Sequence, residues 1–117
     1  MIDDDEEIRR FVCQTLIGAG FSPDEASGGA AGLQLLAKEP APRAVILDLR
    51  MPSMSGEEVL RAIRREHPGL VVIVASGLIA PGKVTELLAL GANACLKKSE
   101  LSDELVPALE RALPESG

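Results

Sequence analysis

The sequence has almost no aromatic residues. Among its 117 residues there is no tryptophan and no tyrosine, and Phe11 and Phe21 are its two phenylalanines, although 46% of the chain is hydrophobic. Aliphatic side chains must therefore fill the core. A chain of this length and apolar content favours one domain spanning residues 1–117, with a core that needs no disulfide.

Long apolar runs, cysteine and positive charge are also scarce. No run of 18 apolar residues predicts a membrane span, and acidic residues begin at position 3, so no signal peptide is visible. Cys13 and Cys95 lie in apolar segments, which is typical of reduced core cysteines in a cytoplasmic protein. The net charge of −6 argues against direct nucleic-acid binding, is compatible with cation binding, and leaves protein partners open.

The most informative segment spans residues 44–56. Four aliphatic residues, Ala44–Leu47, lead straight into Asp48, and a short continuous apolar run is typical of a strand buried on both faces. A proline soon afterwards ends regular structure. Ser55 and Glu58 then form a capping box, which predicts the start of a helix. Asp48 is thus expected at the carboxyl end of a strand, where open α/β sheets bind ligands.

Strand and helix patterns alternate along the whole chain. This alternation predicts a doubly wound parallel sheet with helices on both faces. The second strand carries a proline, which predicts an edge position, and Ser102 is a candidate cap for the last helix. The expected strands are residues 1–2, 21–26, 44–47, 70–75 and 94–97, and the expected helices are 6–19, 30–39, 55–67, 81–91 and 102–113.

Five polar side chains follow the apolar strands. Asp3 and Asp4 follow the first strand, and Asp48, Ser76 and Lys98 follow the third, fourth and fifth. Each alone has an ordinary structural explanation, as a turn or a solvated helix start, but the carboxyl ends of parallel strands meet at one edge of the sheet. Clustered carboxylates suit Mg²⁺, and an aspartate is a nucleophile that forms an aspartyl-phosphate. The set therefore predicts phosphoryl transfer to a carboxylate.

The chain resembles the receiver domains of two-component signalling, also called response-regulator domains. The resemblance covers essentially all 117 residues, and its most specific part is the segment around Asp48. It is carried by Ile2-Asp3-Asp4-Asp5 with Ile8-Arg9-Arg10, by Val45-Ile46-Leu47-Asp48-Leu49-Arg50-Met51-Pro52 with Ser55-Gly56, by Val72-Ile73-Val74-Ala75-Ser76-Gly77, and by Leu90-Gly91-Ala92 leading to Lys98. It implies a five-stranded sheet of order 2-1-3-4-5.

The resemblance also implies a role for each of these polar residues. Asp48 would accept phosphate from a histidine kinase or a phosphotransfer protein. Mg²⁺ would be held by Asp3, Asp4, Asp48 and the Arg50 backbone carbonyl. The switch hydroxyl and the phosphate-binding lysine would be Ser76 and Lys98.

Phosphorylation would change the face formed by the fourth helix, fifth strand and fifth helix, and so regulate an output partner. No catalysis is expected beyond self-directed phosphoryl transfer and autodephosphorylation. The remaining residues leave no room for an output domain, so we expect the output in a partner or in another part of a longer protein. A homodimer is compatible with the sequence.

Three features depart from the family pattern. Ser99 replaces the proline that usually follows the lysine, which predicts a trans peptide bond and a different loop. Cys95 occupies the position of the usual aromatic switch residue. Only Met1 and Ile2 precede Asp3, so we expect a truncated first strand that leaves backbone groups of its neighbours unpaired.

Two other functions remain open from the sequence. The short first strand, Cys95 and Ser99 are compatible with an interaction module that takes no phosphate. The other alternative function is a Mg²⁺-dependent phosphohydrolase with an aspartate nucleophile. It is disfavoured because such haloacid-dehalogenase-like enzymes carry a second aspartate two residues after the nucleophile, where this chain has Arg50.

Overall fold

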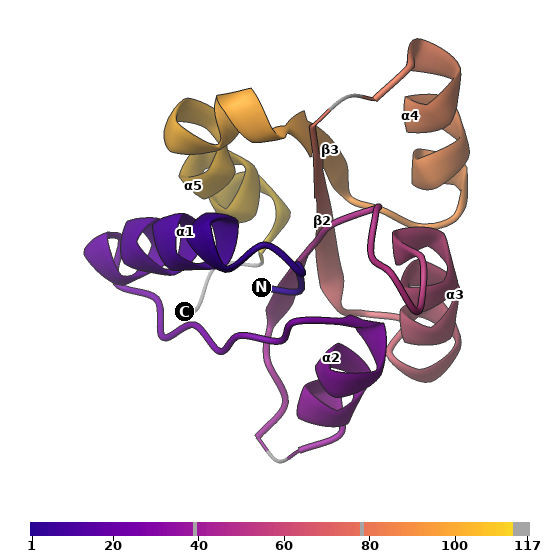
Figure 1. Cartoon of the computed structure of the whole chain (residues 1–117), viewed down its shortest axis with the longest axis horizontal. Helices are drawn as coiled ribbons and strands as arrows, with labels where there is room; N and C mark the ends of the chain where they lie inside the picture. Colours follow the sequence, from indigo (N-terminus) through magenta and orange to yellow (C-terminus); the bar gives the residue numbers. More distant parts are fainter. Residues whose placement is uncertain (39, 78, 114–117) are drawn as a thin grey trace.

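The computed structural model describes residues 1–38, 40–77 and 79–113. Helices and short parallel strands alternate along these residues, as the sequence predicts (Figure 1). In chain order the elements are α1 (Glu6–Gly18), α2 (Gly29–Leu36), β1 (Ala44–Leu47), α3 (Gly56–Glu66), β2 (Val71–Ser76), α4 (Pro81–Ala89), β3 (Ala94–Lys97), the 3-10 helix η1 (Lys98–Glu100) and α5 (Leu101–Ala112).

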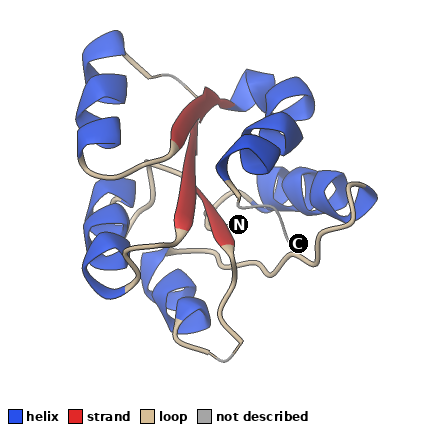
Figure 2. Cartoon of the chain, turned by 180° about the vertical axis from the view of Figure 1, so that it is seen from behind, coloured by secondary structure: helices blue, strands red, loops and turns tan. Residues whose placement is uncertain are grey.

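The regular sheet has three parallel strands in the order β1-β2-β3 (Figure 2). All six residues of β2 are buried, because this strand has a neighbour on each edge and helices over both faces. Side chains alternate between the faces of a strand. Val45 and Leu47 therefore join one core cluster, while Ile46 joins the other.

Two helical layers enclose the sheet. Helices α1 and α5 lie on one side, and α2, α3 and α4 lie on the other (Figure 1). The first layer closes over the sheet through Val12, Leu16 and Leu105, and the second through Leu60 and Ile63. The core is thus almost entirely aliphatic, as the shortage of aromatic residues requires. Within the described residues, no helix is long and apolar enough to cross a membrane.

The first predicted strand is as short as the sequence suggests, whereas the second does not form as a regular strand. Ile2 forms isolated parallel bridges with Ala26 on one side and Leu47 on the other, and no regular strand forms over residues 21–26. Ile2 still lies between the Ala26 segment and β1, so the order 2-1-3-4-5 is retained in reduced form. The prediction of a strand over 21–26 is wrong because the segment has only a two-residue partner and contains a proline.

Most helix starts agree with the capping signals. The Asp5 side chain accepts hydrogen bonds from the first turn of α1, and Ser55 and Glu58 form the predicted capping box of α3. The predicted Ser102 cap is wrong. Helix α5 begins at Leu101, directly after η1, and its N-cap is Glu100. Helix α4 ends at Ala89 rather than Gly91, and the predicted end of the second helix at Glu39 lies outside the described residues.

Candidate functional site

All five predicted polar residues come together at the carboxyl edge of the sheet. Asp3 follows the Ile2 bridge, Asp48 follows β1, Ser76 ends β2, and Lys98 follows β3. A cavity of about 290 Å³ opens there, and Asp4, Asp48, Ser76 and Lys98 are among the residues that line it. Asp3 does not line the cavity. Its side chain is fully buried.

The two neighbouring aspartates have different environments. Asp3 Oδ1 accepts a hydrogen bond from the Asp5 backbone amide over 2.9 Å, which fixes the carboxylate at the start of α1. Asp4 is exposed. Arg9 also holds this loop, because its guanidinium donates to the Asp3 carbonyl oxygen over 2.8 Å and reaches the Glu25 carboxylate over 3.3 Å. The sequence marked Arg9 only as part of a motif and gave no signal for these contacts.

Asp48 is a buried carboxylate with a perturbed acidity. Only 3% of its surface is exposed. Burial, and next the charge of Asp3, raise the pKa of Asp48 to about 6, against the opposing effects of Lys98 and the Arg50 backbone amide. A negative charge close to a carboxylate disfavours its ionised form, so a nearby positive charge would stabilise ionised Asp48.

Lys98 supplies part of that positive charge. Its ammonium lies 3.0 Å from Asp3 Oδ2 and 3.5 Å from Asp48 Oδ1. Burial disfavours the charged lysine, but the attraction of Asp3 and Asp48 outweighs this effect and raises the pKa of Lys98. Lys98 is therefore a cation at neutral pH and bridges the two buried carboxylates.

The carboxylate cluster fits a hard divalent cation. Ligand atoms of Asp3, Asp4 and Asp48 all lie within 4.8 Å of one another. Asp3 Oδ2 is buried, makes no hydrogen bond within the described residues and lies 3.0 Å from the Lys98 ammonium. Because this one ammonium faces both Asp3 and Asp48, negative charge remains uncompensated, and Mg²⁺ prefers carboxylate oxygens together with water. Arg50 lines the same cavity, and its carbonyl as a ligand stays a prediction.

The loop after β1 is held close to Asp48 by a glycine. The Gly56 amide donates to the Leu49 carbonyl oxygen over 2.9 Å. A Cβ at position 56 would overlap the Asp48 carbonyl oxygen and approach Leu49 Cα to 2.7 Å. The sequence included Gly56 in the central motif, but only the packing shows that α3 must begin against the backbone of Asp48.

Comparison with known proteins identifies this arrangement. Residues 1–110 match the family model described as the response regulator receiver domain. The chain belongs to this family. Two response regulators are similar in sequence, namely an NtrX-like protein of Rickettsia bellii, 33% identical over 96% of this chain, and the DNA-binding transcriptional regulator NtrC of Escherichia coli K12, 34% identical over 97%. The alignments span 24% of the length of each of these relatives.

The structural comparison supports the same assignment. The receiver domain of NtrX from Brucella abortus superposes with a TM-score of 0.88 at 29% identity, covering 96% of this chain and 94% of that one. The chain is therefore a receiver domain of the kind used in two-component phosphorelay signalling. Its reduced first strand, Cys95 and Ser99 are departures within this fold.

Proposed function

We propose that this receiver domain accepts a phosphoryl group on Asp48 in a Mg²⁺-dependent reaction with a phosphorylated histidine kinase or phosphotransfer protein. The observation that carries the proposal is the buried Asp48 carboxylate, held among two further aspartates and Lys98 at the mouth of a cavity. It is the carboxylate at the end of an apolar strand in the middle of the fold.

The transfer step uses the groups around the cavity. An Asp48 carboxylate oxygen attacks the phosphorus of a phosphohistidine. The P–O bond forms as the P–N bond breaks, and the electron pair returns to the imidazole, which then takes up a proton. Mg²⁺ bound by Asp3, Asp4, Asp48 and the Arg50 carbonyl would neutralise charge on the transferring group.

Two further groups would hold the phosphorylated product. Lys98 already lies 3.5 Å from Asp48 and can move its ammonium onto a phosphate oxygen. Ser76 lines the cavity and can donate its hydroxyl to another oxygen. Because these groups come from the ends of β2 and β3, their movement would alter the surface formed by α4, β3 and α5. We propose that an output domain or protein partner reads this surface, with no turnover of external substrates.

Mass spectrometry of the intact protein tests the proposal. After incubation with acetyl phosphate and Mg²⁺, we expect a gain of about 80 Da, the mass of one phosphoryl group. Asp48→Asn should abolish the gain, and a chelator should prevent it. Asp103→Asn, which changes an exposed carboxylate on α5, is the matched control and should behave like the parent. A gain that persists in Asp48→Asn would contradict the assignment of the acceptor.

A receiver that takes no phosphate is the second candidate function. It is suggested by Cys95 and Ser99, which stand where receiver domains usually carry an aromatic switch residue and a proline. A parent protein that gains no mass at saturating Mg²⁺, yet is folded by circular dichroism, would support this function.

A further inference from the structure

The loop that carries Lys98 lacks a constraint that receiver domains usually have. Ser99 follows the lysine where the family pattern has a proline. A proline ring fixes the φ angle of its residue, whereas a serine leaves this angle free. Even so, the Lys98 ammonium lies 3.0 Å from Asp3 Oδ2 and 3.5 Å from Asp48 Oδ1, and only 23% of its side chain is exposed. Some other contact must therefore hold this loop.

The residue before Lys98 is held by the sheet and by a side chain. Lys97 is the last residue of β3 and lies opposite Ser76 of β2 in the parallel register. The Lys97 backbone amide donates to Glu100 Oε1 over 2.9 Å. This hydrogen bond closes a ring that contains Lys98, because its donor and its acceptor belong to residues on either side of the lysine. The entry to the loop is therefore fixed directly before Lys98.

The residues after Lys98 are anchored as well. The Leu101 backbone amide donates to the Lys98 carbonyl oxygen, which closes the 3-10 turn η1. Leu101 is buried and belongs to the core cluster shared by α1 and α5. The backbone of Lys98 thus lies between the end of a strand and a core residue, and the Glu100 side chain links the turn back to the strand.

Glu100 uses its side chain for this link and not for the helix that follows. It is the N-cap residue of α5, but its carboxylate makes no capping hydrogen bond there. The side chain turns back to Lys97 instead. Glu100 is exposed, and a single hydrogen bond contributes only modestly to the stability of a fold. Its main effect is therefore local, on the conformation of η1.

We propose that Glu100 is a positioning residue for Lys98. Its carboxylate holds η1 in the conformation that directs the Lys98 ammonium to Asp3 and Asp48, and so replaces the constraint that a proline after the lysine would supply. Glu100 does not line the cavity at the carboxylate cluster, so it acts through Lys98. The kinetic consequence rests on the function proposed for Asp48, whereas the position of Lys98 can be measured without phosphorylation.

Chemical labelling of lysines measures the position of Lys98. Glu100→Ala removes the acceptor of the Lys97 amide, and Glu100→Gln keeps an oxygen there. Limiting acetic anhydride acetylates accessible amines, and peptide mass spectrometry gives the rate at Lys98 relative to that at the exposed Lys38. We expect this relative rate to rise roughly three- to tenfold in Glu100→Ala, as for the loss of one hydrogen bond, and to stay within about twofold of the parent in Glu100→Gln.

Glu104→Ala is the matched control for the change of charge. It removes an exposed carboxylate from the first turn of α5, as Glu100→Ala removes one from the N-cap. Labelling of Lys98 should stay at the parent value in this variant. The proposal would be overturned by equal labelling of Lys98 in the parent and Glu100→Ala, or by an equal rise in Glu104→Ala or Glu100→Gln.

Phosphorylation kinetics show whether Glu100 acts through Lys98. We expect Glu100→Ala to slow the mass gain from acetyl phosphate roughly three- to tenfold, because a displaced ammonium no longer meets the transferring group. In a Lys98→Ala background the same substitution should change the rate by less than about twofold, since effects that pass through one residue are not additive. A full additional loss in that background would overturn the positioning role. If the parent gains no mass, the function proposed for Asp48 fails, and the labelling experiment alone decides the role of Glu100.

Discussion

At the scale of single residues, the candidate site depends on an imbalance of charge. Two buried carboxylates, Asp3 and Asp48, share the single ammonium of Lys98, and Asp3 Oδ2 still lacks a hydrogen-bond partner in the described residues. The metal-free receiver domain therefore contains local repulsion that a divalent cation would relieve. We therefore expect affinity for the cation and instability without it to have the same origin.

Replacing Asp3 by asparagine should separate these two effects. The amide oxygen of the new side chain can still accept from the Asp5 amide, so Asp3→Asn removes charge with little change in shape. We expect Mg²⁺ to bind at least tenfold more weakly by calorimetry, because a carboxylate ligand is lost. The melting temperature in chelator should be equal to that of the parent or higher. A clearly lower melting temperature would contradict the repulsion, and Asp103→Asn is the control.

The acidity of Asp48 predicts a pH dependence for the metal-free protein. The pKa of Asp48 is about 6 in the folded chain, against a reference value of 3.8 for the unfolded chain. At a pH between these two values, the folded state therefore binds more protons than the unfolded state. Stability should therefore fall as pH rises from about 4 to about 6, by an amount on the order of 2–3 kcal/mol, and then remain level.

Asp48→Asn isolates this contribution from that of the other carboxylates. In chelator, the variant should be more stable than the parent at pH 7, and the two free energies of unfolding should converge near pH 4. Urea unfolding across this range measures the difference. A constant difference between parent and variant would contradict the raised pKa.

At the scale of elements, the strand, loop and helix of residues 44–66 act as one unit. The buried strand β1 ends at Asp48, and the Ser55–Glu58 capping box fixes where α3 begins. Gly56 joins the two, since its amide donates to the Leu49 carbonyl oxygen and a Cβ at this position would overlap the Asp48 carbonyl oxygen. The position of the Asp48 carboxylate is therefore set by the start of a helix as well as by the end of a strand.

Gly56→Ala should disturb the site through the backbone alone. The added methyl group would overlap the Asp48 carbonyl oxygen, so the loop must move away from the strand end. We expect destabilisation of about 1–3 kcal/mol and a slower gain of mass from acetyl phosphate. Gly82→Ala is the control, because a Cβ there meets nothing within 4 Å and alanine favours the helix. Equal phosphorylation rates for the two variants would contradict the role of Gly56.

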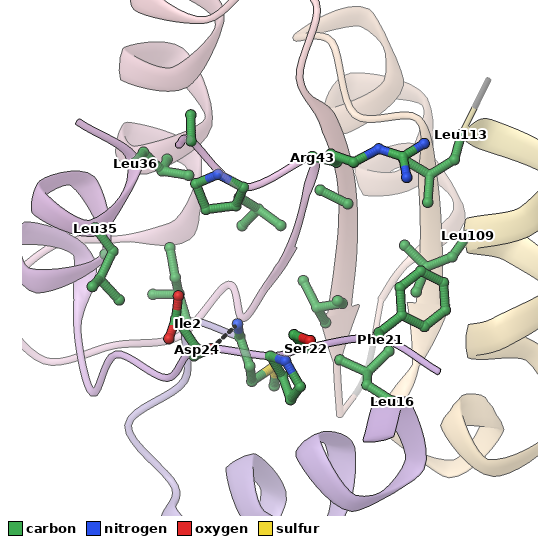
Figure 3. Close-up of a pocket in the computed structure, with 18 of the residues that line it drawn as sticks. Ile2, Leu16, Phe21, Ser22, Asp24, Leu35, Leu36, Arg43, Leu109 and Leu113 are labelled. Atoms are coloured by element: carbon green, nitrogen blue, oxygen red, sulfur yellow. Dashed lines mark hydrogen bonds between the residues drawn. The ribbon is translucent and has the colours of Figure 1, made fainter. Parts of the chain in front are cut away.

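At the scale of the whole molecule, the central ladder of the sheet is short. Ile2 is the one residue between the Ala26 segment and β1 that forms bridges to both. A cavity of about 460 Å³ lies beside this ladder, and Ile2, Ala44 and Ile46 are among the residues that line it (Figure 3). Because Asp3 directly follows Ile2, the order of the carboxylate cluster depends on this short ladder.

Lengthening the first strand should stabilise the fold. Adding about four apolar, β-branched residues ahead of Met1 would extend this ladder. Each residue costs about 1–2 kcal/mol in ordering, whereas burial of a Val or Ile side chain returns about 1.5–3 kcal/mol. We expect the melting temperature to rise by several degrees, at roughly 4 °C per kcal/mol, and exchange in Val45–Leu47 to slow. A four-residue Gly-Ser extension is the control. No difference between the two extensions would show that the sheet needs no strand there.

Much of the fold follows from local patterns along the sequence. Apolar runs end at Asp48, at Ser76 and just before Lys98, so the carboxyl edge of a parallel sheet collects these side chains whatever the details of packing. Capping signals such as Asp5 and Ser55 give helix starts for the same reason, since a cap contacts only its own first turn. Ser102 fails as a cap because η1 continues directly into α5, which depends on how the chain leaves β3.

The sequence by itself determined the alternation of strands and helices and the identity of the residues at the strand ends, because periodicity and turn chemistry are local. Only the tertiary structure decided that Asp3 is buried beside Lys98 while Asp4 is exposed, and that residues 21–26 form no regular strand. It alone shows that a cavity of about 460 Å³ lies beside the Ile2 ladder. These features depend on which distant segments meet, because burial and pairing arise from packing between elements.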